Sequence, residues 1–96
     1  MRLTESQAQY IAQRIRAAMG EGSRIWLFGS RADDTRRGGD VDLYVEPTHA
    51  VGLADELRTQ SDLADHLDLD VDLIVARGEP GSRPIHRIAR STGVPL

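Results

Sequence analysis

The sequence predicts a small α/β protein of the α+β kind, built from a mixed β-sheet with helices packed on one face. Helical and strand-like segments alternate along the 96 residues in the order α-β-α-β-α-β-α, and such alternation usually gives a sheet covered by helices. The two later strand segments carry apolar residues on one face and aspartates on the other. We therefore expect the helices to cover the apolar face and to leave the aspartate face open.

The first helix is expected over residues 4–19. Thr4 followed by Gln7 is typical of a capping box at a helix start. The apolar residues that recur at spacings of three and four, and so share one stripe, are Ala8, Ile11, Ile15 and Ala18. Gly20 and Gly22 then end the helix.

Three strands are expected, over residues 24–28, 40–46 and 70–75. The first is the apolar run RIWLF, and Pro47 closes the second. Strand alternation places two sets of residues on the open face, namely Asp40, Asp42 and Tyr44 on one strand and Asp70, Asp72 and Ile74 on the other. Between the first two strands, the stretch SRADD is expected to open a short helix.

Two later helices are expected over residues 48–67 and 84–92. The first would place four apolar residues on one side, Val51, Ala54, Leu57 and Ala64. The second has Pro84 in its first turn and Gly93 after its end. Its basic residues are expected to form a solvated face, with an acidic partner or a nucleotide as the alternatives; they are Arg83, Arg87 and Arg90.

Composition and charge limit the kind of protein. The length suits a single domain, 1–96, and 40% hydrophobic with 28% charged residues predict a globular chain. There is no cysteine, which excludes disulfides and thiolate metal sites. No apolar run approaches the roughly 20 residues of a membrane span, and the N-terminus lacks a signal-peptide pattern, so we expect a cytoplasmic protein without a membrane partner. The net charge of −3 argues against an extensive nucleic-acid surface.

The motif DVDL occurs twice, although aspartate is depleted in strands. Asp40 and Asp42 project from the same face of their strand, with Cα atoms roughly 6–7 Å apart, and would repel each other without a cation. Mg²⁺ binds one or two carboxylates together with waters and substrate phosphates. A third aspartate from the last strand, Asp70 or Asp72, would complete a site for two metal ions. The alternative is that these aspartates are solvated groups at the strand starts.

The residues before the first acidic pair suit a bound phosphate. Gly29 and Ser30 follow the first strand and precede the expected short helix, whose first N–H groups favour an anion. Gly29 lets a phosphate approach the backbone, Ser30 can donate a hydrogen bond, and Arg31 adds charge. On its own the Gly-Ser pair indicates an ordinary turn and helix cap. Together with the carboxylates it predicts a nucleoside triphosphate bound as its magnesium complex.

The stretch LFGSRADDTRRGGDVDLYVE resembles the signature of the nucleotidyltransferase superfamily related to DNA polymerase β, and more closely that of the minimal nucleotidyltransferases, or MNT proteins. The resemblance implies the nucleotidyltransferase fold, with Gly29 and Ser30 as the phosphate-binding pair. It also implies Asp40 and Asp42 as metal ligands. The family usually places its third acid directly before a leucine and an apolar run, which implies Asp72. The loop between Ser30 and Asp40 is one residue shorter than is usual in the family.

This resemblance also implies a function. MNT proteins are Mg²⁺-dependent nucleotidyltransferases, so we expect two Mg²⁺ ions and the transfer of AMP from ATP onto an acceptor hydroxyl. They are commonly paired with a HEPN-domain protein, and the MNT member resembles an antitoxin that modifies a tyrosine of the HEPN toxin with AMP. The alternatives are a binding module that neutralises its partner by contact, or a transferase that acts on RNA or on a small molecule.

The histidines and aromatic residues receive no chemical role from the sequence. His49, His66 and His86 are spread over three segments and are not expected to bind a metal together. Trp26 lies in the middle of a strand and is expected in the core. Tyr44 shares the aspartate face, where it could either stack on a nucleotide base or pack on the sheet.

Overall fold

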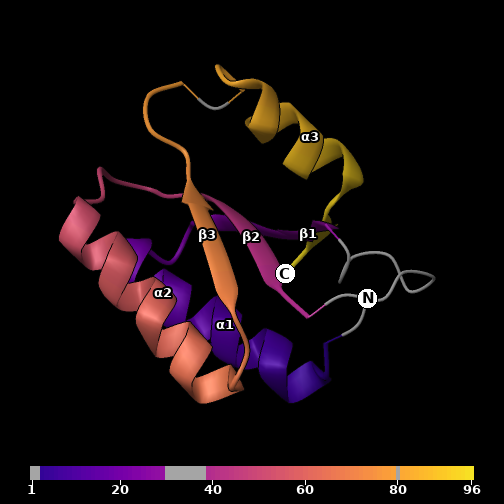
Figure 1. Ribbon diagram of the computed structural model, residues 1–96. Helices are drawn as coiled ribbons and strands as arrows, with labels where there is room; N and C mark the ends of the chain where they lie inside the picture. Colours follow the sequence, from indigo (N-terminus) through magenta and orange to yellow (C-terminus); the bar gives the residue numbers. More distant parts are fainter. Residues whose placement is uncertain (1–2, 30–38, 80) are drawn as a thin grey trace.

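The described residues form a four-stranded mixed sheet with three helices (Figure 1). The computed structural model describes residues 3–29, 39–79 and 81–96. In chain order the elements are α1 (Glu5–Met19), β1 (Arg24–Phe28), β2 (Val41–Glu46), α2 (Leu53–Leu67), β3 (Val71–Val75), α3 (Pro84–Thr92) and β4 (Val94–Pro95). The predicted α/β class with a mixed sheet is confirmed. The short helix expected after Gly29 lies outside the described residues.

The sheet has the strand order β3-β2-β1-β4. β2 pairs antiparallel with β1 and parallel with β3, so the two strands associated with aspartates lie side by side and run the same way. β4 pairs Val94 with Leu27 and Pro95 with Trp26. The sequence does not predict β4, because a strand of two residues is too short to show alternation.

The start of α1 follows from its capping box. Thr4 Oγ1 accepts a hydrogen bond from the N–H of Gln7 at 3.1 Å, and Gln7 Oε1 accepts one from the N–H of Thr4 at 2.8 Å. These two bonds satisfy N–H groups that have no partner within the helix. The buried residues Ile11, Ile15 and Met19 then form a stripe that faces the sheet. The predicted first helix is confirmed at both ends.

α2 begins five residues later than predicted, at Leu53 rather than residue 48. The preceding residues are held by other parts of the chain. The N–H and the hydroxyl of Thr48 both donate to the carbonyl of Met19, at 3.2 and 3.0 Å. Arg77 donates to the carbonyl of Val51. These tertiary hydrogen bonds fix the connection before the helix can start.

The buried face of α2 also differs from the prediction. The helix buries Thr59, Leu63 and Leu67, whereas Ala54 and Leu57 face solvent. Thr59 can be buried because its hydroxyl donates to the carbonyl of Asp55 at 2.7 Å, within the helix itself. The expected stripe was correct for Val51 and Ala64, which pack on the core, and wrong for Ala54 and Leu57, because the buried stripe runs through the polar Thr59 instead.

α1 and α2 pack together on the apolar face of the sheet, as predicted. β2 and β3 contribute six buried side chains to this core, Val41, Leu43, Val45, Val71, Leu73 and Val75. They alternate along β2 and β3, so each strand directs every second residue toward the helices.

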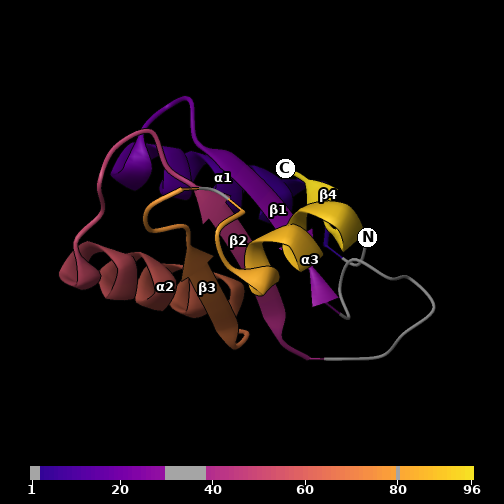
Figure 2. The same cartoon turned by 90° about the horizontal axis from the view of Figure 1, so that it is seen from above.

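α3 lies on the opposite face, which the sequence analysis expected to be open. Its buried residue Ala89 packs with Tyr44 and Ala76, next to Trp26 and Phe28. Figure 2 shows α1 and α3 on opposite sides of β1 and β2. The prediction of helices on one face therefore holds for α1 and α2, and α3 is the exception. It leaves the aspartate-bearing part of its face uncovered.

The helices are short and amphipathic. α1 and α2 have 15 residues each, and α3 has nine. Within the part of the chain that the structure describes, none combines the length and apolar character needed to cross a membrane.

Candidate functional site

Two of the predicted aspartates face each other across neighbouring strands. Asp42 on β2 is the direct register partner of Asp72 on β3. Neighbouring strands lie about 4.7–4.9 Å apart, and side chains in register on parallel strands point to the same face. Asp40 immediately precedes β2 and has the same parity as Asp42. The structure thus places Asp40, Asp42 and Asp72 together on one face of the sheet.

The electrostatics of Asp42 confirm this arrangement. Asp42 is partly buried, whereas Asp40 and Asp72 are exposed. Burial raises the pKa of the Asp42 carboxyl above its ordinary value, and the negative charges of Asp72 and then Asp40 raise it further. None of the ion pairs among the described residues involves these three carboxylates, and a bound cation would compensate their charge.

The position of Asp70 is different. Asp70 precedes β3, and its carbonyl accepts a hydrogen bond from the N–H of Val41 at 2.9 Å. It lines a shallow pocket of about 440 Å³ with Asp40 and with Asp65 and Asp68 of the α2 end. The alternation of side chains along the strand could not distinguish Asp70 from Asp72. The register of β2 with β3 places Asp72 beside Asp42.

Gly29 connects β1 to the aspartates. Phe28 at the end of β1 is the register partner of Asp42, so Gly29 follows directly beside that carboxylate. Gly29 has φ of 73°, a left-handed conformation that favours glycine. A Cβ atom at this position would also collide with the carboxylate of Asp42. Both the backbone conformation and the space beside Asp42 therefore require glycine here.

The other two predicted phosphate-binding residues, Ser30 and Arg31, lie outside the described residues. Their role in binding a triphosphate remains a prediction. Among the predicted phosphate-binding residues, Gly29 is the one that the structure places, and it lies next to the aspartates.

The carboxylates suit a hard divalent cation by their chemistry, because Mg²⁺ prefers oxygen ligands and keeps open positions for water and phosphate. In the described part of the chain, no three His, Cys, Asp or Glu side chains already surround a cation position. Asp40 and Asp72 are exposed and can rotate toward Asp42. The residues present therefore fit Mg²⁺ by the chemistry of their oxygen donors.

The histidines do not join this set. The ring of His66 stacks on Tyr10, with ring centroids 3.5 Å apart. His86 is buried in α3, and His49 is exposed in the connection before α2. The expectation that they share no metal site agrees with these separate positions.

Tyr44 could stack on a nucleotide base or pack on the sheet, and the structure decides between the two. Tyr44 is fully buried, with its ring stacked between Trp26 and His86 at centroid distances of 5.5 and 5.1 Å. Its hydroxyl donates to Glu46 at 2.8 Å, and Arg90 lies 3.6 Å from the same carboxylate. Burial and then the bond to Glu46 raise the pKa of Tyr44. Tyr44 packs under α3 and is not available to a nucleotide base.

Several solved structures share this fold. A chain of a complex between the tri-AMPylated HEPN toxin of Shewanella oneidensis and an MNT antitoxin matches with a TM-score of 0.77 and 22% identity, over 97% of this chain and 71% of that one. A chain of a toxin–antitoxin structure with AMP-PNP matches with a TM-score of 0.77 and 24% identity, over 97% and 72%. A chain of a mutant MntA–HpeT toxin–antitoxin complex gives 0.75 and 25%, over 93% and 69%.

A comparison with models of sequence families identifies the family of this chain more directly than the structural matches do. No protein with a curated description matches this sequence. The family model described as Polymerase beta, Nucleotidyltransferase matches residues 13–94, which include Gly29 and all three clustered aspartates. Since this match spans most of the 96 residues and agrees with the fold, the chain belongs to the polymerase β nucleotidyltransferase family.

Proposed function

We propose that this protein is an MNT antitoxin that transfers AMP from ATP onto a tyrosine hydroxyl of a HEPN-domain partner. One observation carries this proposal: Asp42 and Asp72 are in register on neighbouring strands, with Asp40 beside them and Gly29 against Asp42. The family of the chain and the AMPylated HEPN toxin in a structurally similar complex support the same function.

In the proposed reaction, the acceptor oxygen attacks the α-phosphorus of ATP. A new oxygen–phosphorus bond forms, the bond from the α-phosphorus to the bridging oxygen breaks, and pyrophosphate leaves. Asp72 helps to remove the proton of the attacking hydroxyl. Gly29 and Ser30 hold the β- and γ-phosphates through backbone N–H groups and the serine hydroxyl. The products are an AMP-tyrosine phosphodiester and pyrophosphate.

Asp40, Asp42 and Asp72 are the residues that would hold Mg²⁺. Two bound Mg²⁺ ions would neutralise charge on the phosphates and on the attacking and leaving oxygens. The crowding of these carboxylates supports this role, because it is unfavourable for the chain alone. The protein contributes positioning and a preorganised set of charges.

The test is transfer of label from α-³²P-ATP to the HEPN-domain partner, which should be sought first in the adjacent gene. Asp42→Asn and Asp72→Asn should each lower the transfer rate about a hundredfold or more, since each removes a charge at the reacting phosphate. Asp70→Asn serves as the matched control, because it changes the same residue type next to the cluster at a position that is not in register with Asp42, and it should keep most of the activity.

Tight binding of the partner without any transfer by the unmodified chain would show instead that the protein acts by contact alone. Transfer of label to RNA or to a small molecule, with none to the partner, would contradict the proposed acceptor but not the proposed catalytic residues.

A further inference from the structure

α3 has an exposed stripe that the proposed reaction does not use. Its inner side is buried, with His86 and Ala89 both fully covered. Its outer side exposes residues spaced by three and four along the helix, Pro84, Arg87, Ile88 and Ser91. This spacing places them in one stripe, as on a helix that packs against another element. Ile88, in the middle of the stripe, is 53% exposed.

The charges of this outer face are also uncompensated. Four described arginines lie within 4 Å of a carboxylate, namely Arg14, Arg58, Arg77 and, on α3 itself, Arg90. Arg83 and Arg87, like Arg24, have no such carboxylate among the described residues. Arg87 thus lies next to the exposed Ile88 in this stripe, and Arg83 stands exposed at the start of the helix, on a chain whose net charge is −3. This combination is complementary to a surface that carries carboxylates around an apolar side chain.

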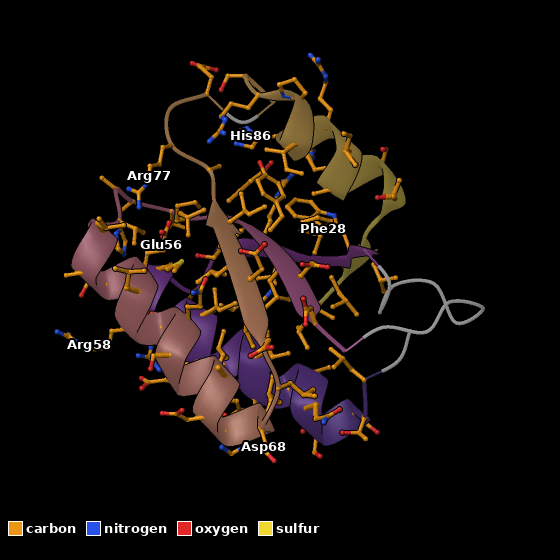
Figure 3. The ribbon with its side chains drawn as sticks, in the orientation of Figure 1. Phe28, Glu56, Arg58, Asp68, Arg77 and His86 are labelled. Carbon is orange, nitrogen blue, oxygen red and sulfur yellow. The ribbon has the colours of Figure 1, made fainter. Side chains whose placement is uncertain are left out.

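The position of α3 relates this stripe to the aspartates. α3 packs on the same face of the sheet as Asp42, through Tyr44, which is two residues further along β2. Figure 3 shows His86 and Phe28 between α3 and the sheet. A helix with its side chains is about 10–12 Å thick. A partner resting on the outer face of α3 would therefore lie above the open aspartate region, with space beneath it for a nucleotide.

We propose that the outer face of α3, formed by Arg83, Arg87 and Ile88, is the surface that docks the HEPN-domain partner. The proposal rests on the proposed function, and it commits to a helical surface of the partner that presents acidic residues around an apolar one. A nucleic-acid backbone fits less well, because it would leave Ile88 without an apolar contact and because two free arginines give few phosphate contacts. Docking here brings the acceptor hydroxyl of the partner toward Asp42 and Asp72.

The test compares matched substitutions on two helices. Arg87→Glu and Ile88→Asp alter the α3 surface. Arg58→Glu and Leu57→Asp are the controls, because Arg58 is an exposed arginine that points away from α3 and Leu57 has the same 53% exposure as Ile88 (Figure 3). We expect the dissociation constant for the HEPN-domain partner, measured by titration calorimetry, to rise about tenfold or more for each α3 variant. The controls should bind like the unmodified chain.

Two further measurements exclude a folding defect and show whether a loss of transfer comes from weaker docking of the partner. Each α3 variant should keep the melting temperature of the unmodified chain and its affinity for Mg²⁺–ATP. Transfer of AMP should fall at low partner concentration and recover at saturating partner, because docking changes the apparent KM for the partner and leaves the aspartates intact. The affinity of the unmodified chain should also fall with added salt, and less steeply for Arg87→Glu.

Unchanged partner affinity in both α3 variants would overturn the docking surface, as would an equal loss in the α2 controls. Loss of binding to a single-stranded RNA 20-mer, with partner affinity retained, would identify a nucleic-acid surface instead. A different result separates the two proposals. If the unmodified chain binds the partner and the α3 variants do not, but no AMP is transferred, then the docking surface stands and the proposed reaction fails.

Discussion

At the scale of single residues, Asp42 carries a charge that the fold accommodates poorly. Its pKa is raised by burial and by the charges of Asp72 and Asp40. A carboxyl group whose pKa is higher in the folded than in the unfolded chain contributes stability that is complete below the unfolded value. That contribution is lost as the pH rises through the unfolded and then the folded pKa. At neutral pH, the ionised Asp42 therefore lowers the free energy of unfolding.

Asp42→Asn should accordingly stabilise the metal-free protein while it abolishes transfer. In EDTA at about pH 7, the melting temperature should rise, and at about pH 3, below the ordinary aspartate value, the gain should largely disappear because both states are then protonated. Thermal unfolding followed by circular dichroism measures both. Asp70→Asn is the control and should show a smaller gain at neutral pH. A melting temperature that falls at neutral pH would contradict this account of Asp42.

At the scale of elements, α2 shows how packing selects one stripe of a helix from two candidates. The stripe with more apolar residues near the start of the helix, at Leu53 and Leu57, faces solvent. The stripe through Thr59 and Leu63 faces α1 and the sheet. Arg77 fixes this choice at the start of α2, because it bonds both the Val51 carbonyl and, at 3.0 Å, the Glu56 carboxylate.

Leu63→Ala should lower the free energy of unfolding by about 2–5 kcal/mol, because it removes buried methyl groups and leaves a cavity. Leu57→Ala is the same substitution on the same helix at an exposed position, and should change it by about 0.5 kcal/mol or less. Urea denaturation of both variants measures the difference. Similar losses at the two positions would show that the stripe is assigned wrongly.

At the scale of the whole molecule, the two faces of the sheet have different roles. One face carries the core with α1 and α2. The other is divided between α3, which packs on Tyr44 and Trp26, and the aspartate cluster, whose charges raise the pKa of Asp42. β2 connects the two regions, because it carries both Tyr44 and Asp42. A ligand that compensates the aspartates should therefore stabilise the entire fold.

Mg²⁺–ATP should raise the melting temperature of the unmodified chain. Binding at a hundred times the dissociation constant stabilises a folded protein by about 2.7 kcal/mol. Differential scanning fluorimetry with Mg²⁺–ATP, with ATP in EDTA and with neither separates the contribution of the cation. Asp42→Asn should show little of the shift that depends on Mg²⁺. A full shift in this variant would mean that the nucleotide complex binds elsewhere.

Much of the fold and part of the candidate site could be predicted from short-range patterns. The capping box of Thr4, the three longer strands and the bounds of α3 depend on neighbouring residues, and all of them are confirmed. The DVDL motifs placed the aspartates on one strand face, because side chains alternate along a strand whatever it packs against. The requirement for glycine before Ser30 is local only in part: the left-handed φ of Gly29 concerns the turn that ends β1, whereas the lack of space for a Cβ comes from Asp42 on the next strand.

Other features depended on contacts between distant residues. Parity placed both Asp70 and Asp72 on one face, and the pairing of β2 with β3 set Asp72 opposite Asp42. The amphipathic pattern of α3 predicted a helix, but the face of the sheet assigned to it was wrong, because that face depends on Tyr44, forty residues earlier in the chain. The sequence by itself determined which acids are present and which way they point along each strand. Only the tertiary structure decided which of them meet, because register and layering are set by packing across the sheet.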